Sequence, residues 1–513
     1  MCECKQRSGS GGNTPHYKEY VLNKPIYRIS IAYDSVKMYN IAKWVSIKKY
    51  WEVLMEKVKT KRHLVRNIVL IVLAVLVLGF VAYKLISGYV SSLPKYTYSY
   101  GTVTQDSMVS YPDTSFAVIS DTHYYDTSLG TTGAAFEECL ASDRKLLKES
   151  AELLERAVDR ILESDVKFVL SSGDLTKDGE RINHEKVAEQ FQRLVDAGIK
   201  VYVVPGNHDV DNPLAVRYVG DGTEPVENVS EEEFAEIYSN FGYGDAIMRD
   251  PETLSYVAEP EDGLWLVALD TNEYEKNQPD TEEVWAGELV QSQIDWLEGV
   301  LAQAAEKGKA VIVLEHHGIV EHWEGQSKLH PDYLLSDYKY VGKLLTSYGV
   351  RLAFTGHYHA QDISLEDNGD EGFIYDLETG SLSTAPCSMR FCTISDNNFT
   401  DKTEHLIDSY GADFAASARA FVKKTIYTEA YNTLKGYRVS DKDSDYIADT
   451  ISEAFLAHYD GNEDASTRVE IDKSKLSLWS KFIYSQYSYA IEGLWVDLEP
   501  ADSNVTFSLG SVS

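Results

Sequence analysis

The chain has 513 residues, enough for two or three domains with a sizeable hydrophobic core. Its formal net charge is −33, and because the first 95 residues hold 16 Lys and Arg against 5 Asp and Glu, the remainder carries −44. So acidic a body argues against a nucleic-acid-binding surface, which needs a basic patch or stripe. It suits an exported domain that must stay soluble.

A long apolar segment lies near the start of the chain. Ile68–Tyr83 is uninterrupted, and beyond Lys84 the apolar character continues to Val90, so the segment approaches the roughly 20 residues that span a bilayer. It is preceded by the basic residues Lys57, Lys59, Lys61, Arg62 and Arg66. By the positive-inside rule, we expect residues 1–66 to be a basic cytoplasmic tail and residues 67–90 a transmembrane signal anchor. The acidic body would then lie on the extracytoplasmic side of the cell membrane, held by a single pass. A cleaved signal peptide and a buried core helix remain alternatives.

Five short apolar runs in the body each end at residues with metal-ligand chemistry. Phe116–Ile119 leads to Asp121 and His123, Phe168–Leu170 to Asp174, Val201–Val204 to Asn207, His208 and Asp209, Val311–Leu314 to His316 and His317, and Leu352–Phe354 to His357, Tyr358 and His359. Runs this short and apolar predict strands buried on both faces. In open α/β sheets, sites form outside the carboxyl ends of the strands. We therefore expect these carboxylate, amide and imidazole groups to converge on one small volume, as a dinuclear metal centre requires.

Segments with helical spacing alternate with these runs and predict a layered α/β domain over residues 113–395. They are Leu146–Leu162, His184–Ala197, Leu289–Ala305 and Tyr338–Tyr348. Residues 91–112 are polar and predict a stalk. Two long loops, Tyr124–Ser142 and Asp211–Ser230, leave from the ligand ends of their strands and are expected to shape the mouth of the site.

The pattern changes after about residue 395. Amphipathic helices are expected over Phe414–Leu434 and Tyr446–Tyr459, and a third over Leu476–Ile491. Residues 396–513 are therefore predicted to form a helical C-terminal subdomain, in which no chemistry-bearing motif stands out.

Taken in order, the elements D-x-H, G-D, G-N-H-D, a paired His and G-H-x-H resemble those of the calcineurin-like metallophosphoesterases, over roughly residues 113 to 395. The stretch Gly173–Gly179, which is G-D-L-x-x-x-G, followed by Gly206–Asp209, is similar to the class III cyclic-nucleotide phosphodiesterase branch. The resemblance implies a layered β-sandwich flanked by helices. Lys177 stands where purple acid phosphatases have an iron-binding Tyr, and the phosphate-gripping arginines of the protein Ser/Thr phosphatases are missing.

The resemblance also implies a role for each ligand. Asp121, His123 and His359 would hold one ion, and Asn207, His316 and His357 the other. Asp174 would bridge the two, because a carboxylate offers two oxygens. Mixed nitrogen and oxygen ligands suit Mn, Fe or Zn, and a hydroxide held between the ions would be the nucleophile. His208 would be the general acid, with Asp209 orienting its imidazole.

The expected activity is hydrolysis of phosphoric esters, and the missing arginines favour diesters. A phosphomonoesterase on the same metal centre is the alternative, and a non-catalytic, surface-anchored binding protein is a third. The expected partners are a phosphoester substrate and a membrane.

Five residues outside the ligand set carry weaker expectations. His317 and His322 are ordinary loop histidines or substrate contacts, and His184 is expected to be a solvated surface group. Cys387 and Cys392 are close enough in sequence to form a disulfide, with two buried thiols as the equal alternative.

Overall fold

The computed structural model describes residues 62–91, 109–279, 281, 283–369, 372–461 and 463–511. They fall into two compact units, the helix α2 (Arg62–Ser91) and the body from residue 109 onward. Apolar side chains of α2 are exposed, among them Leu73 at 52%, Leu78 at 67% and Phe80 at 61%. Within the described residues, no helix is both long and apolar enough to cross a membrane. The anchor expected over residues 67–90 gains no support from this, and residues 1–61 and 92–108, with most of the expected tail and stalk, lie outside the described residues.

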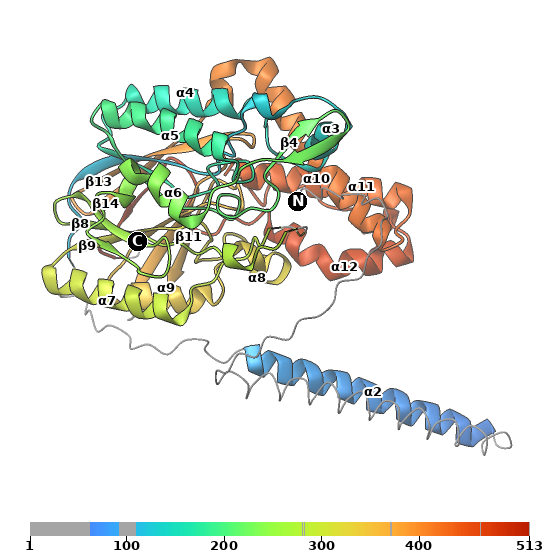
Figure 1. Ribbon diagram of the computed structural model, residues 1–513. Coiled ribbons are helices and arrows are strands. Elements are labelled where there is room, and N and C mark those ends of the chain that lie inside the picture. Colours follow the sequence, from blue (N-terminus) through green and yellow to red (C-terminus); the bar gives the residue numbers. More distant parts are fainter. Residues whose placement is uncertain are drawn as a thin grey trace, which may run out of the picture. The chain divides into compact units, whose positions relative to one another are not determined.

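Two mixed sheets form the centre of the body (Figure 1). The first has the order β15-β14-β13-β1-β2-β3, formed by Thr506–Ser508, Asn398–His405, Ser388–Ser395, Thr114–Ile119, Phe168–Ser171 and Lys200–Val203. The second has the order β11-β12-β10-β9-β8-β7-β6, formed by Asp362–Asp367, Phe373–Glu378, Leu352–Thr355, Ala310–Leu314, Leu264–Ala268, Tyr256–Glu261 and Met248–Arg249. A separate hairpin pairs β4 (Val216–Val219) with β5 (Gly222–Pro225).

Helices cover the outer faces of the two sheets (Figure 1). α4 (Ser150–Leu162) and α5 (Arg181–Asp196) lie on the side of the first sheet, and α7 (Gln291–Lys307) and α9 (Tyr338–Ser347) on the side of the second. The others are α3 (Ala134–Ser142), α6 (Glu231–Ile237), α8 (Gln326–Leu329), α10 (Ala412–Gly436), α11 (Asp441–Tyr459) and α12 (Leu478–Gly493). The prediction of a layered α/β domain followed by three helices is confirmed, with element ends shifted by a few residues.

The two sheets pack face to face through apolar side chains. Phe116 of β1 and Phe354 of β10 meet edge to face, with ring centroids 5.3 Å apart. On β9, Ile312 belongs to this shared core, while Val311 and Val313 belong to a second cluster with residues of α7 and α9. Because both faces of the central strands are buried, their sequences are apolar at every position rather than at alternate ones.

The parallel strands decide where the functional residues meet. β1 pairs in parallel with β2 and β2 with β3, and β8, β9 and β10 are likewise parallel. All ligand-bearing loops therefore leave the two sheets at carboxyl ends of parallel strands.

Three expectations about the connections are wrong. The segment 396–513 is not helical alone, because β14 and β15 extend the first sheet. The loop predicted over Tyr124–Ser142 contains α3, and the loop over Asp211–Ser230 contains the β4–β5 hairpin.

For Cys387 and Cys392, the sequence left a disulfide and two buried thiols as equal alternatives. Cys387 and Cys392 are both free and buried. Cys392 lies within β13, whose extended strand begins at Ser388, directly after Cys387. At about 3.3 Å per residue, the strand from Ser388 to Cys392 carries the chain beyond the Cα distance of about 7 Å that a disulfide tolerates.

Candidate metal centre

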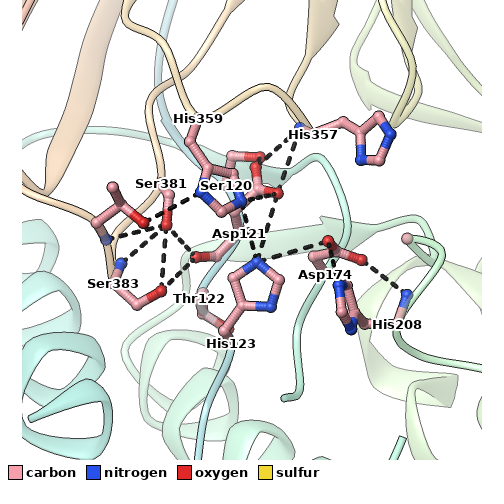
Figure 2. A network of polar contacts seen from close by, with 12 residues as sticks. Ser120, Asp121, Thr122, His123, Asp174, His208, His357, His359, Ser381 and Ser383 are labelled. Carbon is pink, nitrogen blue, oxygen red and sulfur yellow. Dashed lines mark hydrogen bonds and ion pairs between the residues drawn. The ribbon is translucent and has the colours of Figure 1, made fainter. Parts of the chain in front are cut away.

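Six of the seven predicted ligands come together in two groups that share the carboxylate of Asp174. Figure 2 shows Asp121, His123, Asp174, His357 and His359. In the first group, the ligand atoms of Asp121, His123, Asp174 and His359 lie within 4.8 Å of one another. His359 Nε2 lies 3.3 Å from Asp121 Oδ1, and His123 Nε2 lies 3.5 Å from Asp174 Oδ2. The two imidazole nitrogens are themselves only 3.1 Å apart. A cation between these atoms would satisfy both nitrogens and both carboxylates at once.

The second group contains Asp174, His316 and His357. His316 Nε2 lies 3.5 Å from Asp174 Oδ2 and 3.2 Å from Asn207 Oδ1, so the amide joins the group as predicted. His357 Nε2 is buried without a hydrogen-bond partner among the described residues. Buried polar atoms in proteins almost always have a partner, and a metal ion at this place would supply it.

Asp174 connects the two groups. Its Oδ2 atom lies 3.5 Å from an imidazole nitrogen on either side, His123 Nε2 and His316 Nε2. Its Oδ1 atom accepts a hydrogen bond of 3.0 Å from the backbone N–H of His208. A dinuclear metal centre is therefore supported, and its imidazole, carboxylate and amide donors suit Mn, Fe and Zn alike.

The backbone at the ligands adopts a conformation that residues other than glycine rarely take. Asp121, His123, Asp174, His357 and His359 all have positive φ, between 39° and 74°. Each such position costs on the order of 1–3 kcal/mol and is retained where function requires it. Here the left-handed turn directly after each strand aims the side chain at the centre.

Two motif glycines allow close approach between ligand loops. A Cβ on Gly206 would lie 2.1 Å from Asp174 Oδ1, and a Cβ on Gly356 would lie 2.5 Å from Asp121 Oδ2. Larger residues would displace these carboxylates, which explains the glycines that open G-N-H-D and G-H-x-H.

Neighbouring groups orient the ligands. His316 Nδ1 donates to Ser172 O at 2.7 Å, and His359 Nδ1 lies 3.1 Å from Thr384 Oγ1. Each contact occupies the outer ring nitrogen, so that Nε2 faces the centre. The loop after β12 also holds Asp121, because Ser381 Oγ donates to its backbone oxygen at 2.8 Å (Figure 2).

His208 lies beside the centre, and its partner is not the predicted one. Its Nδ1 atom donates to Asp178 Oδ1 at 2.9 Å, while Nε2 faces Lys145 Nζ at 3.3 Å and Asp174 Oδ2 at 3.9 Å. Burial and Lys145 lower the pKa of His208, but Asp174, Asp178 and Glu283 outweigh them and raise it above its usual value. Asp178 could have been found in the sequence, since it belongs to the G-D-L-x-x-x-G stretch.

Asp209, expected to orient His208, instead ties two ligand loops together. Its carboxylate accepts hydrogen bonds from the backbone N–H of Leu175 at 3.0 Å, of Thr176 at 2.9 Å and of Gly206 at 2.9 Å. Burial, followed by the charge of Asp174, raises the pKa of Asp209 to about 6. Its role is therefore to position the loops after β2 and β3.

The three weaker histidine candidates are all fully buried. His184 Nε2 lies 2.9 Å from Asp209 O and Nδ1 lies 2.9 Å from Tyr238 Oη, so the expectation of a surface group is wrong. α5 begins at Arg181, and this register turns His184 inward. His317 uses both ring nitrogens, one 2.7 Å from Thr271 Oγ1 and one 3.2 Å from Trp285 O, and is a core histidine. His322 lies in a separate polar cluster, described below.

The pocket over the metal centre has walls that the sequence did not indicate. They include Arg144 and Lys145 from the α3–α4 loop, Tyr459 from the end of α11, and the aromatic residues Trp285 and Tyr333. Tyr358, which the sequence places between two ligand histidines, also lines the pocket. Arg144 Nη1 donates to Tyr459 Oη at 2.6 Å, which connects the loop with α11. The C-terminal helices therefore contribute to the site although they carry no motif.

Comparison with known proteins agrees with this geometry. Residues 114–361 match the family model of the calcineurin-like phosphoesterases, which supports placing this segment in that metallophosphoesterase superfamily. No curated protein matches the chain. Among solved structures, a dimetal phosphatase from Danio rerio is similar with 17% identity and a TM-score of 0.42, covering 57% of this chain and 96% of that one. A purple acid phosphatase from yellow lupin seeds is similar with 12% identity and a TM-score of 0.34, covering 60% of this chain and 53% of that one.

Proposed function

From the premise that residues 114–361 form a calcineurin-like metallophosphoesterase domain, we propose that the chain is a dinuclear metal-dependent phosphodiesterase. The main observation in favour of hydrolytic activity is the position of Asp174. Its Oδ2 atom lies 3.5 Å from His123 Nε2 on one side and 3.5 Å from His316 Nε2 on the other. This arrangement is what two neighbouring cations need. Ions held there by Asp174 with His123 and His316 would neutralise charge on a phosphoryl group and supply a nucleophilic water at neutral pH.

The residues of the chain supply the proton for the leaving group. Asp178 accepts from His208 Nδ1, so a protonated imidazole presents its second N–H, at Nε2, to the pocket. Burial alone would raise the pKa of Asp178, but Lys177 and His208 lower it to about 2. The ionised carboxylate stabilises the imidazolium until its proton passes to the leaving oxygen.

The preference for diesters rests on the charges of the pocket walls. Each cation there already faces a carboxylate: Arg144 faces Glu429, Lys145 faces Asp143 at 4.0 Å, and Lys177 faces Asp178. Because each of these cations is paired with a carboxylate, the walls offer little positive charge to compensate the second negative charge of a phosphomonoester dianion. A diester brings one charge and a second organic group, which could pack against the aromatic side chains of Trp285 and Tyr333 in the pocket lining.

A phosphomonoesterase is the second candidate, and Lys145 is the observation in its favour. Its Nζ atom lies 3.3 Å from His208 Nε2, close to where a phosphoryl oxygen would lie. Initial rates of the Mn²⁺-loaded full chain on bis(p-nitrophenyl) phosphate and p-nitrophenyl phosphate separate the two. We expect a higher kcat/KM for the diester. A higher value for the monoester would reassign the enzyme, and a chain that binds no metal would favour the non-catalytic alternative.

We also propose that the chain is anchored in the cell membrane with its catalytic domain outside the cytoplasm. This rests on the apolar sequence from Ile68 to Val90 and the basic residues before it. The exposed apolar side chains of α2 are compatible with a lipid environment. Fractionation tests it: the protein should resist extraction by high salt and dissolve in detergent. External protease on intact cells should release an active body, and a protected body would contradict the orientation.

A further inference from the structure

A second buried group of potential metal ligands lies away from the catalytic centre, between the start of β11 and the end of α11. It consists of Asp362, His458 and Glu463, whose ligand atoms lie within 4.8 Å of one another. All three residues are at most 5% exposed. His458 Nδ1 lies 2.7 Å from Glu463 Oε1 and 3.8 Å from Asp362 Oδ2, so one imidazole nitrogen faces both carboxylates.

One oxygen of each of the Asp362 and Glu463 carboxylates has no hydrogen-bond partner among the described residues. Asp362 Oδ2 and Glu463 Oε2 are buried and accept no hydrogen bond from the described residues. The other oxygen of Asp362 is held firmly, by His322 Nδ1 at 2.6 Å and Ser364 Oγ at 3.1 Å. Leaving a buried carboxylate oxygen unsatisfied costs on the order of 1–3 kcal/mol or more. Metal-binding carboxylates are commonly fixed by hydrogen bonds to one oxygen while the other faces the ion. In Asp362, Oδ1 is fixed in this way and Oδ2 is the oxygen that could face an ion.

No Lys or Arg side chain among the described residues forms an ion pair with Asp362 or Glu463. Among the described residues, the ion pairs of Asp362 and Glu463 are formed with histidines alone. A further buried carboxylate, that of Asp502, accepts from the backbone N–H of Ile363 at 3.0 Å and is 3% exposed. The guanidinium of Arg390 donates to the backbone oxygens of Asp362 at 2.8 Å and Asp502 at 2.9 Å.

The loop that carries Glu463 packs tightly on the catalytic domain. Gly461 has φ of +60°, and a Cβ there would lie 2.3 Å from the backbone oxygen of Gln361. Only glycine allows this approach, which brings the end of α11 onto the residue before Asp362. The geometry of the group is thus set by the backbone on both sides.

We propose that Asp362, His458 and Glu463 bind a third divalent transition-metal ion, distinct from the dinuclear centre, which joins α11 to β11. Its ligands are one imidazole nitrogen and two carboxylate oxygens. Such a donor set suits Zn²⁺ or Mn²⁺, whereas Ca²⁺ and Mg²⁺ take oxygen ligands alone. The proton now between His458 Nδ1 and Glu463 Oε1 leaves when the ion binds.

The position of this ion relates it to the substrate pocket. The residue after His458 is Tyr459, whose Oη accepts from Arg144 Nη1 at 2.6 Å, and both line the pocket. An ion at the end of α11 therefore fixes one wall of the active site without touching the substrate.

Metal counting on the full chain tests the proposal. Protein dialysed against Zn²⁺ and then against metal-free buffer is analysed by inductively coupled plasma mass spectrometry. We expect three ions per wild-type chain and one fewer in Glu463→Gln. The matched control is Asp464→Asn. Asp464 is the next residue in the chain, and its exposed carboxylate accepts hydrogen bonds from Ser466. It should keep the wild-type count. The test depends only on the difference of one ion between wild type and Glu463→Gln. It therefore remains valid even if the dinuclear centre binds fewer than two ions.

A second measurement uses the wild-type protein and so does not depend on whether Glu463→Gln folds. Anomalous diffraction at the zinc edge from wild-type crystals should show a peak about 2.0–2.2 Å from His458 Nδ1 and the two carboxylates. No peak there, or equal metal counts in wild type and Glu463→Gln, would overturn the proposal.

Discussion

Two regions of the site differ in what holds their side chains in place. The first, the ligand edge, consists of the loops after β1, β2, β3, β9 and β10, which carry the metal ligands. The second, the wall, is the part of the pocket formed by the α3–α4 loop and the end of α11, with Arg144, Lys145 and Tyr459. At the ligand edge, strands buried on both faces end in left-handed turns, and backbone groups orient the side chains. The N–H of His357, for example, lies 3.2 Å from Asp121 Oδ1. The wall is held by side-chain contacts between distant segments, such as Arg144 with Tyr459 and Glu429. The metal ligands are thus oriented mainly by local backbone geometry, whereas the pocket wall depends on contacts between distant segments.

Replacing Asp174 with Asn tests the ligand edge at its most sensitive point, and we expect the largest effect. Asn keeps the shape but removes the charge that two cations share, so both metal content and activity should be lost. Metal analysis and hydrolysis of bis(p-nitrophenyl) phosphate measure the two. Asp196→Asn, an exposed carboxylate at the end of α5, is the control and should change neither. A variant at position 174 with full metal content and more than about a tenth of wild-type turnover would refute the bridging role.

Replacing His208 with Ala should leave the metals in place and lower kcat by about 10²–10⁴-fold, as loss of a general acid does. The loss should be smaller for p-nitrophenolate, a good leaving group, than for an alkoxide. Equal losses for both leaving groups would argue against proton donation.

Replacing Asp178 with Asn should lower kcat less than this, because the imidazole remains but loses its anionic partner. In a His208→Ala background the same change should have little further effect, since Asp178 acts through His208. Additive losses in this double-mutant cycle would mean that Asp178 has a role independent of His208.

The wall should respond through KM rather than kcat. Lys145→Ala removes a cation next to His208, and losing a hydrogen bond to a charged group costs about 1.5–3 kcal/mol. We expect KM for the diester to rise about tenfold or more with metal content unchanged. Lys148→Ala is the matched control, since Lys148 lies on the same loop but pairs with Glu137, 3.7 Å away at the surface. The comparison between edge and wall fails if Lys145→Ala lowers kcat as His208→Ala does.

Asp209→Asn should have the smallest effect on catalysis and a clear one on stability. The carboxylate accepts bonds from three backbone N–H groups, and the amide of Asn would turn a donor toward one of them. We expect a loss of about 1–3 kcal/mol in the free energy of unfolding, measured by urea denaturation, with metal content and kcat near wild type. An unaltered unfolding midpoint would contradict its positioning role.

Much of the ligand edge could be predicted from the sequence, because each ligand follows its strand within a few residues. Local apolar runs indicate the strands, and parallel pairing brings their ends together. Asp209 was misassigned because proximity along the chain to His208 does not decide which way a side chain points. His184 was misassigned because the start of α5 determines which side of that helix is buried.

The wall could not be predicted for a related reason. Arg144 and Tyr459 are 315 residues apart in sequence, and their contact depends on how α11 packs against the α3–α4 loop. The group of Asp362, His458 and Glu463 is likewise assembled from a strand start, a helix end and a loop. No local pattern marks such residues, since their chemistry arises only from tertiary packing.

The measurement that tests the central claim most directly is anomalous diffraction from crystals of the Mn²⁺-loaded protein. The account predicts two peaks on either side of Asp174, about 3.5–4 Å apart. One peak should lie among Asp121, His123 and His359, and the other among Asn207, His316 and His357. A single peak, or none within coordination distance of Asp174, would contradict a dinuclear centre.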